Sequence, residues 1–164
     1  MPDLYGGFGT SLTYKGFDLA LDFTYQIGGQ VYDGDYASMM APPTASSKGN
    51  AFHADLLNSW TPENSGSNIP RFQFGDNYTT ATSDRFLTSA SYLSLQNINF
   101  GYTLPVSLTR HAQIEKIRVY LSADNVWVWS KRQGLDPRQS ITGSVTNSYY
   151  APMRTISGGI TLTF

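Results

Sequence analysis

Apolar and polar residues alternate along several segments of the sequence, each about ten residues long. The alternation is most regular in residues 155–164, where Ile156, Ile160, Leu162 and Phe164 fall on one side and small polar residues fall between them. A period of two predicts a β-strand with one apolar and one polar face. A tilted strand of about ten residues is also long enough to cross a membrane.

Four other segments show the same pattern: Leu4–Tyr14, Phe17–Ile27, Tyr92–Thr103 and residues 116–126. In Tyr92–Thr103 the apolar residues change parity between Leu95 and Ile98. An extra residue in the strand, a β-bulge, would produce this change, and so would a strand that runs past the rim of a membrane. The chain is therefore predicted to be all-β, with about five antiparallel strands.

The connections between these strands alternate between short and long. Residues 14–16 form a tight turn and residues 104–115 a moderate connection, whereas residues 28–91 and 127–154 are long, polar and rich in Gly, Pro, Ser and Asn. Transmembrane β-barrels alternate in this way, because their periplasmic turns are short and their extracellular loops long. Five strands then place the C-terminus on the periplasmic side, with two long extracellular loops.

One short helix is predicted inside the first long loop, at residues 50–60. Phe52, Leu56 and Trp60 recur at a spacing of four residues, and Pro62 follows the segment. Trp60 is a candidate contact for a lid protein or a substrate, and packing against its own loop is the alternative role.

The composition narrows the class of protein. Only 14% of the residues are charged, against about 25% in soluble domains, while 40% are hydrophobic. The net charge is −1 and the 11 Lys and Arg residues are scattered, so no basic surface for nucleic acid is predicted. No apolar run approaches the roughly 18 residues of a membrane helix. The chain has no cysteine, which excludes disulfides and thiolate metal sites.

The sequence contains no motif that indicates catalysis. A GxSxG elbow and a phosphate-binding loop are both absent from the sequence. His53 and His111 lie far apart, and Asp33-Gly34-Asp35 lacks the further ligands of a calcium loop. We therefore expect the chain not to be an enzyme and to bind no metal or cofactor.

Several short sequence motifs, taken together with their order and spacing, resemble those of a known protein family. They are LYGGFG at residues 4–9, YKGFDL at 14–19, WTPEN at 60–64, IPR at 69–71, SYL at 91–93, GYTLP at 101–105, SADNV at 122–126, GLDP at 134–137 and the closing residues 152–164. Together they resemble the C-terminal region of the SusC/RagA family of TonB-dependent outer-membrane transporters, which import glycans or peptides.

The resemblance implies a place in a larger protein. Members of the family carry an N-terminal plug and a barrel of about 22 strands, so residues 1–164 are expected to be the C-terminal part of the barrel domain, a fragment without the plug and the earlier strands. The implied location is the outer membrane of a Gram-negative cell. The implied partners are a SusD-like lipoprotein, the TonB complex acting through the missing N-terminal part, the outer-membrane assembly machinery, membrane lipid, and an oligosaccharide or peptide substrate.

Two groups of residues are candidate sites. Phe164, with Leu162 and Ile160, resembles the terminal signal that the outer-membrane assembly machinery reads, and the alternative is an ordinary strand that ends in Phe. The second group is aromatic and flanks the last long loop: Trp127, Trp129, Tyr149 and Tyr150. These residues are candidates for an interfacial aromatic belt or, alternatively, for stacking on a sugar ring.

The main alternative to a barrel is a small soluble β-sandwich that binds carbohydrate through its loop aromatics. A sandwich would bury the stripe of Leu19, Leu21, Phe23 and Tyr25 against a second sheet, whereas a membrane barrel would turn it toward lipid. A passive porin is a third possibility, which would differ in lacking a plug and TonB dependence.

Overall fold

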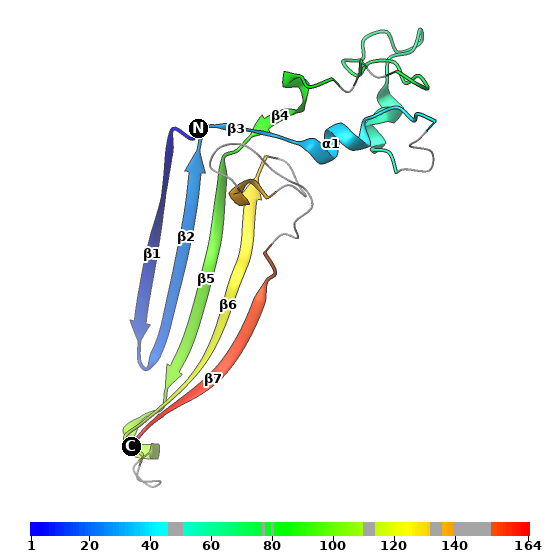
Figure 1. Cartoon of the computed structure of the whole chain (residues 1–164). Helices are drawn as coiled ribbons and strands as arrows, with labels where there is room; N and C mark the ends of the chain where they lie inside the picture. The colour runs from blue at the N-terminus through cyan, green and yellow to red at the C-terminus, as the bar shows by residue number, and fades with distance from the viewer. Residues whose placement is uncertain (46–50, 77, 80, 110–113, 132–135, 140–151) are drawn as a thin grey trace.

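A five-stranded antiparallel sheet forms the body of the computed structural model, which describes residues 1–45, 51–76, 78–79, 81–109, 114–131, 136–139 and 152–164. The strands lie in the order β1-β2-β5-β6-β7 (Figure 1). Their bounds are Leu4–Tyr14 (β1), Phe17–Ile27 (β2), Tyr92–Thr103 (β5), Lys116–Ser130 (β6) and Thr155–Thr163 (β7). The all-β prediction and its five antiparallel strands are confirmed, and the sheet is open within this chain.

The strand boundaries agree with the alternation to within one residue except in β6, which continues beyond residue 126 to Ser130. Trp127 and Trp129, which the sequence placed at the start of the long loop, therefore belong to a strand. The prediction failed at this point because Asn125 interrupts the pattern: its φ of 51° is left-handed, and the β5–β6 register shifts beside it. The alternation resumes beyond this irregularity.

The short connection between β1 and β2 is a two-residue hairpin turn. Lys15 and Gly16 both have positive φ, 46° and 88°, as a turn that matches the right-handed twist of the strands requires. A Cβ on Gly16 would lie 2.8 Å from the carbonyl oxygen of Thr103. Both the backbone conformation and the close approach of β5 therefore favour glycine at position 16.

The long connection between β2 and β5 folds into a small unit, which we call the outer subdomain (residues 30–90). It contains β3 (Gln30–Tyr32), α1 (Gly34–Met39), η1 (Ala54–Asn58), η2 (Asp84–Phe86) and β4 (Leu87–Ser89). β3 pairs with β4 in a second, two-stranded sheet. Within the described parts of the chain, the buried hydrophobic residues belong to this segment: Val31, Ala37, Met40, Phe86 and Ala90.

The helix predicted at residues 50–60 corresponds to a single 3-10 element, Ala54–Asn58, while α1 was not predicted. Asp33 caps α1, since its Oδ1 accepts a hydrogen bond from the Tyr36 amide at 2.9 Å. This is the ordinary role of Asp before a helix.

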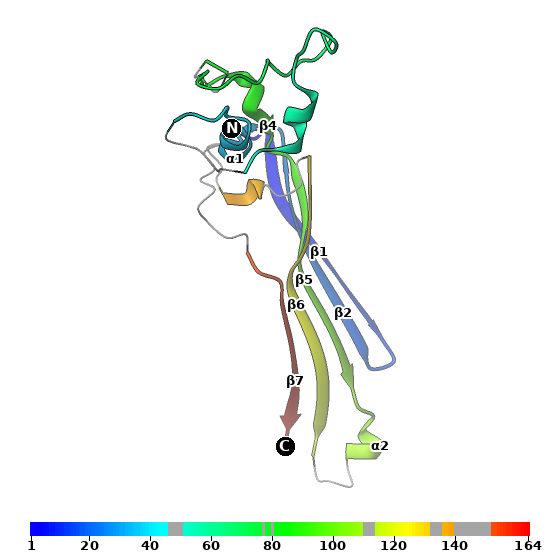
Figure 2. The same cartoon turned by 90° about the vertical axis from the view of Figure 1, so that its right-hand side faces the viewer.

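Figure 2 turns the sheet nearly edge-on and shows what lies beside it. The short helix η4 (Pro137–Gln139), from the connection between β6 and β7, sits off one face of the sheet near the end that carries the outer subdomain. The connection of β5 to β6, with α2 (Val106–Thr109), lies at the opposite end. Among the described residues, none of the helices has the length and hydropathy needed to cross a bilayer.

Candidate functional site

One face of the five-stranded sheet is apolar from edge to edge, and we call it the apolar face. The strand register aligns its residues: Leu4, Phe8, Leu12, Tyr14, Phe17, Leu19, Leu21, Phe23, Tyr25, Leu93, Leu95, Ile98, Phe100, Tyr102, Val119, Leu121, Trp127, Trp129, Ile156, Ile160 and Leu162. Phe8 is 55% exposed and Ile160 67%. No second sheet covers this face within the part of the chain that is described, which argues against the sandwich alternative. So large an exposed apolar surface marks an interaction with lipid or protein.

Cross-strand aromatic contacts order the apolar face. The rings of Phe8 and Phe23 stack with their centroids 4.9 Å apart, and Phe17 lies 4.4 Å from Tyr102 and 5.9 Å from Phe100. The 11-residue strands β1 and β2 span about 34 Å at about 3.4 Å per residue. A tilt of about 40° reduces this to about 26 Å, close to the apolar band of about 25 Å on membrane barrels.

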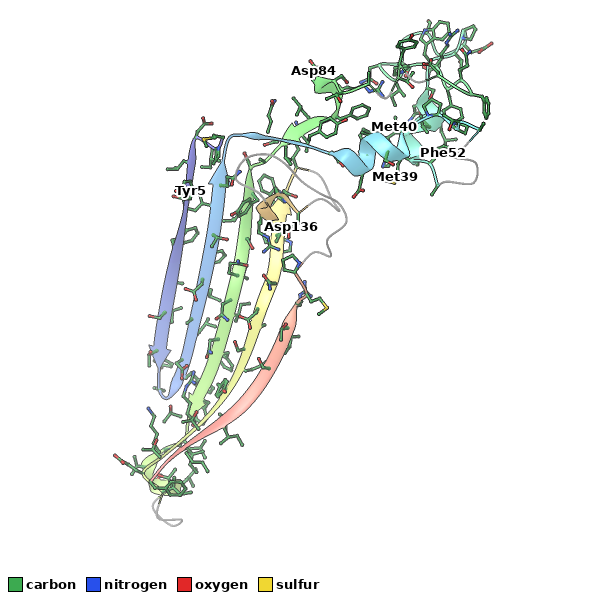
Figure 3. All side chains as sticks on the ribbon, in the orientation of Figure 1. Tyr5, Met39, Met40, Phe52, Asp84 and Asp136 are labelled. Atoms are coloured by element: carbon green, nitrogen blue, oxygen red, sulfur yellow. The ribbon has the colours of Figure 1, made fainter. Side chains whose placement is uncertain are left out.

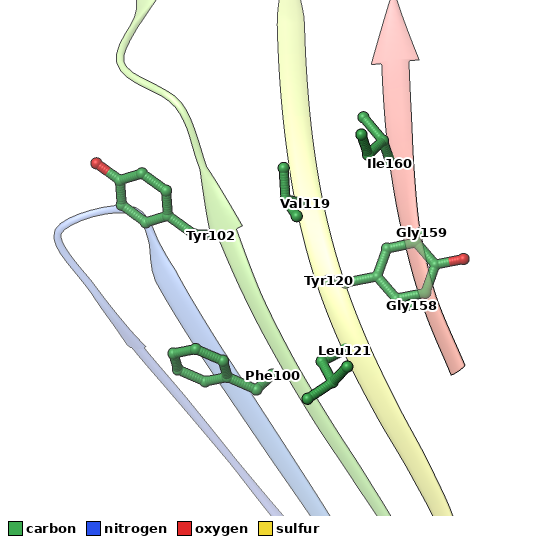
Figure 4. Close-up of a pocket in the computed structure, with 8 residues that line it drawn as sticks. All are labelled: Phe100, Tyr102, Val119, Tyr120, Leu121, Gly158, Gly159 and Ile160. Carbon is green, nitrogen blue, oxygen red and sulfur yellow. The ribbon is translucent and has the colours of Figure 1, made fainter. Parts of the chain in front are cut away.

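A shallow groove of about 480 Å³ interrupts the apolar face (Figure 4). Phe100, Tyr102 and Val119 line it on one side and Ile160 on the other, and Gly158 contributes no side chain. The groove follows from the register, because Gly158 lies opposite Leu121 where the neighbouring strands carry large residues. It is open and has no charged side chain in its lining.

The opposite face carries the polar residues of every strand, and we call it the polar face. Near the end of the sheet that carries the β1–β2 turn, an ion pair joins Asp18 of β2 to Arg118 of β6 across β5. Arg118 Nε donates to Asp18 Oδ1 at 3.0 Å, Nη2 donates to the second carboxylate oxygen, and Nη2 also donates to Asn99 Oδ1 at 2.9 Å. Gly101 of β5 makes this possible, since a Cβ there would lie 2.5 Å from Arg118 Nη2 and 2.6 Å from Asp18 Oδ2.

The predicted bulge is present in β5 and is confirmed at Gln96, where the register shifts against both β2 and β6. It turns two consecutive side chains, Gln96 and Asn97, onto the polar face. Asn97 Nδ2 donates to Asp124 Oδ1 at 2.6 Å. Bulges commonly redirect side chains in this way. Here the bulge places the side-chain amides of Gln96 and Asn97 next to each other on the polar face.

Gln96 and its neighbour Ser94 hold a segment of the last long connection. Arg138 Nη1 donates to Ser94 Oγ at 3.1 Å and to Gln96 Oε1 at 3.2 Å. The same guanidinium binds Asp136, with Nε 2.9 Å from Oδ1 and Nη2 2.7 Å from Oδ2. Burial alone would raise the pKa of Asp136, but the hydrogen bonds and the charge of Arg138 outweigh it and hold the pKa below its usual value. We call this arrangement the Arg138 clip.

The outer subdomain carries a second exposed groove, of about 360 Å³, beside η1. Phe52 and Phe72 meet there edge to face, with centroids 5.5 Å apart, and Figure 3 shows Phe52 farther from the sheet than Met39 and Met40. His53 also lines it and accepts a hydrogen bond from the Asp55 amide at Nδ1, so it caps η1. Among the described residues, no three His, Cys, Asp or Glu side chains gather where a metal ion could bind.

The structure places the predicted site residues in three positions. Ile160 and Leu162 lie on the apolar face of β7, and Phe164 follows the strand with its side chain exposed. Trp127 and Trp129 lie on the same face near the outer end of β6. Trp60 is partly exposed in the outer subdomain, where its amide donates to the Ile69 carbonyl. Tyr149 and Tyr150 lie outside the described residues.

The contacts that organise the polar face could not be predicted from the pattern of the sequence. Alternation puts Asp18 and Arg118 on polar positions, but only the register of three strands shows that they meet across Gly101. Arg138 follows directly after residues 134–137, a motif that carries the family resemblance. That motif was the one feature of the sequence that pointed to this region. The partners of Arg138, Ser94 and Gln96, lie 44 and 42 residues before it in the sequence.

An antiparallel sheet with one lipophilic face, one polar face and long connections at one end is the class of structure that forms the walls of membrane β-barrels. Comparison with known proteins agrees with this class. The chain is 28% identical to TonB-dependent receptor P3 and 29% identical to TonB-dependent receptor P26, both of Formosa agariphila, over 99% and 100% of its length. It spans 16% and 17% of those two proteins. No family model matches the chain.

Solved structures give the same result. The chain superimposes on part of the RagAB peptide transporter with a TM-score of 0.81 and 30% identity, covering 98% of this chain and 17% of that one. The RagAB peptide importer in a closed-closed state gives a TM-score of 0.82, with 28% identity and coverage of 100% and 17%. The chain is thus a homologue of TonB-dependent receptors, and its predicted resemblance to the SusC/RagA family is confirmed.

Proposed function

We propose that the chain is the C-terminal part of the barrel of a TonB-dependent transporter in the outer membrane of a Gram-negative cell. The observation that carries the proposal is the separation of the two faces, since a sheet with an exposed apolar face and an ion-paired polar face fits lipid on one side and a water-filled lumen on the other. The likeness to TonB-dependent receptors over nearly the whole chain supports it.

The two edges of the sheet, β1 and β7, have no partner strand within the described residues. Unpaired backbone groups are not tolerated in lipid, because nothing there can satisfy them. Both edges therefore pair with further strands of the same barrel, and the outer-membrane assembly machinery recognises the end formed by Ile160, Leu162 and Phe164. Trp127 and Trp129 form part of the outer aromatic belt.

The substrate is an oligomeric nutrient, a glycan or a peptide, passed inward with energy from the TonB complex through a plug elsewhere in the protein. The similarity to a peptide importer favours a peptide. A SusD-like lipoprotein caps the outer end, where the outer subdomain projects beyond the sheet (Figure 1).

Uptake by a strain lacking the gene tests this function. The strain should lose import of one class of fluorescent oligomer, peptide or glycan, and the intact gene should restore it. A complemented strain with an inactivated TonB should not recover import, and the tagged protein should copurify with a lipoprotein. Unchanged uptake of both classes in the deletion strain would count against transport by this protein.

A further inference from the structure

The Arg138 clip joins parts of the chain that are distant in sequence. The guanidinium uses Nε and Nη2 for Asp136 and Nη1 for Ser94 and Gln96. Both partners of the ion pair are almost fully covered, with side-chain exposures of 13% for Arg138 and 8% for Asp136. A buried, bidentate ion pair with further hydrogen bonds is specific in geometry. Residues 136–139 are therefore held at one position on the sheet.

The residues of the sheet that the clip contacts lie on the polar face. Ser94 lies opposite Thr24 of β2 and Val128 of β6, and its exposure is 0%. The acceptor beside it, Gln96, is the extra residue of β5 in its pairing with β2, and without this bulge β5 could not present Gln96 and Asn97 together on this face. The bulge and the clip therefore act together, and they hold residues 136–139 against the polar face of the sheet.

We propose that the Arg138 clip is a positioning device that holds residues 136–139 on the lumen side of the wall, so that these residues narrow the substrate passage at the level of the bulge. The proposal rests on the proposed function, in which the polar face lines the lumen. Arg138 positions this short segment through Asp136, Ser94 and Gln96, and the width of the passage at this level depends on those contacts.

A cysteine reporter tests the clip directly, since the chain has no native cysteine. Ser94→Cys would be introduced into the complete protein, purified in detergent, and its reaction with a water-soluble maleimide would be timed with and without Arg138→Ala. Because the clip covers position 94, removal of Arg138 should accelerate labelling about tenfold or more. Gln96→Ala, which removes a single acceptor, should give a smaller acceleration in the same direction.

Ser122→Cys is the matched control, because it lies on the polar face but is not among the residues that Arg138 binds, which are Asp136, Ser94 and Gln96. Its labelling should not change with Arg138→Ala. Heat-modifiable migration would show that each variant keeps a folded barrel. Equal labelling at position 94 with and without Arg138, in a folded barrel whose position 122 labels readily, would overturn the clip alone. If position 122 were unreactive and Leu121→Cys reacted instead, the assigned faces, and with them the proposed function, would be wrong.

Discussion

The sheet and the outer subdomain are built from similar residues and use them in opposite ways. In the outer subdomain, Phe86 is 1% exposed and packs with Ala37 and Met40 in a core. In the sheet, large apolar residues such as Phe8 and Ile160 are mostly exposed. The subdomain gains stability by removing apolar surface from water, whereas the sheet leaves its apolar surface exposed. This is the difference expected if the sheet faces lipid, as proposed above, and the subdomain faces water.

The core of the outer subdomain should be the most sensitive position in water. Phe86→Ala should cost about 3–5 kcal/mol, because it removes a fully buried ring and leaves a cavity. Hydrogen exchange of the complete protein should show α1 and β3 losing protection while the amides of β2 and β5 keep theirs. Loss of protection in the sheet as well would show that the two regions fold as one unit.

The apolar face should be the sensitive position in lipid. Leu121→Arg should cost about 2–4 kcal/mol where the side chain lies near the middle of the bilayer, while Ser122→Arg, one residue along the same strand, should cost far less. Urea unfolding of the complete protein from phospholipid vesicles measures both. Equal costs for the two variants would remove the distinction between the faces.

The hairpin turn should show a smaller effect. Gly16→Ala should cost about 1–2 kcal/mol, because Gly16 has φ 88° and its Cβ would meet the Thr103 carbonyl. Gly66→Ala is the control, since a Cβ at Gly66 meets nothing within 4 Å. Unfolding in urea should separate the two variants, and a loss of stability in Gly66→Ala as large as in Gly16→Ala would contradict this reading of the turn.

The smallest effect should appear at low pH, in the Arg138 clip. The pKa of Asp136 is lower in the folded protein than in an unfolded chain, so its contribution to stability is complete above the unfolded value of about 4 and is lost as the pH falls through the folded pKa. Labelling of Ser94→Cys, corrected for the reactivity of a free thiol, should stay constant from about pH 5 to 8 and rise below about pH 4. An increase confined to neutral pH would exclude Asp136 as the cause.

How much of this could be predicted from the sequence depends on the range of the interactions. The period-two alternation is local, so β1, β2 and β5 begin and end where it predicts. The change of parity after Leu95 likewise located the bulge. The continuation of β6 past Asn125 was missed, because one left-handed residue breaks the local pattern without ending the strand.

The contacts of the polar face and the core of the outer subdomain could not be predicted in the same way. The Asp18–Arg118 pair spans 100 residues and depends on Gly101 leaving space between them. The helix α1 has six residues, too few to show a helical period, and packing of Met40 on Phe86 completes the core beside it. Both features depend on tertiary contacts that no local pattern records.

The assignment of the two faces is the central claim, and one pair of adjacent positions tests it most directly. Leu121→Cys and Ser122→Cys, in the complete protein in native outer-membrane vesicles, would be exposed to a water-soluble maleimide. We predict that position 122 reacts and position 121 does not, because a thiol facing hydrocarbon neither ionises nor meets the reagent. Reaction at position 121 with protection at position 122 would contradict the account.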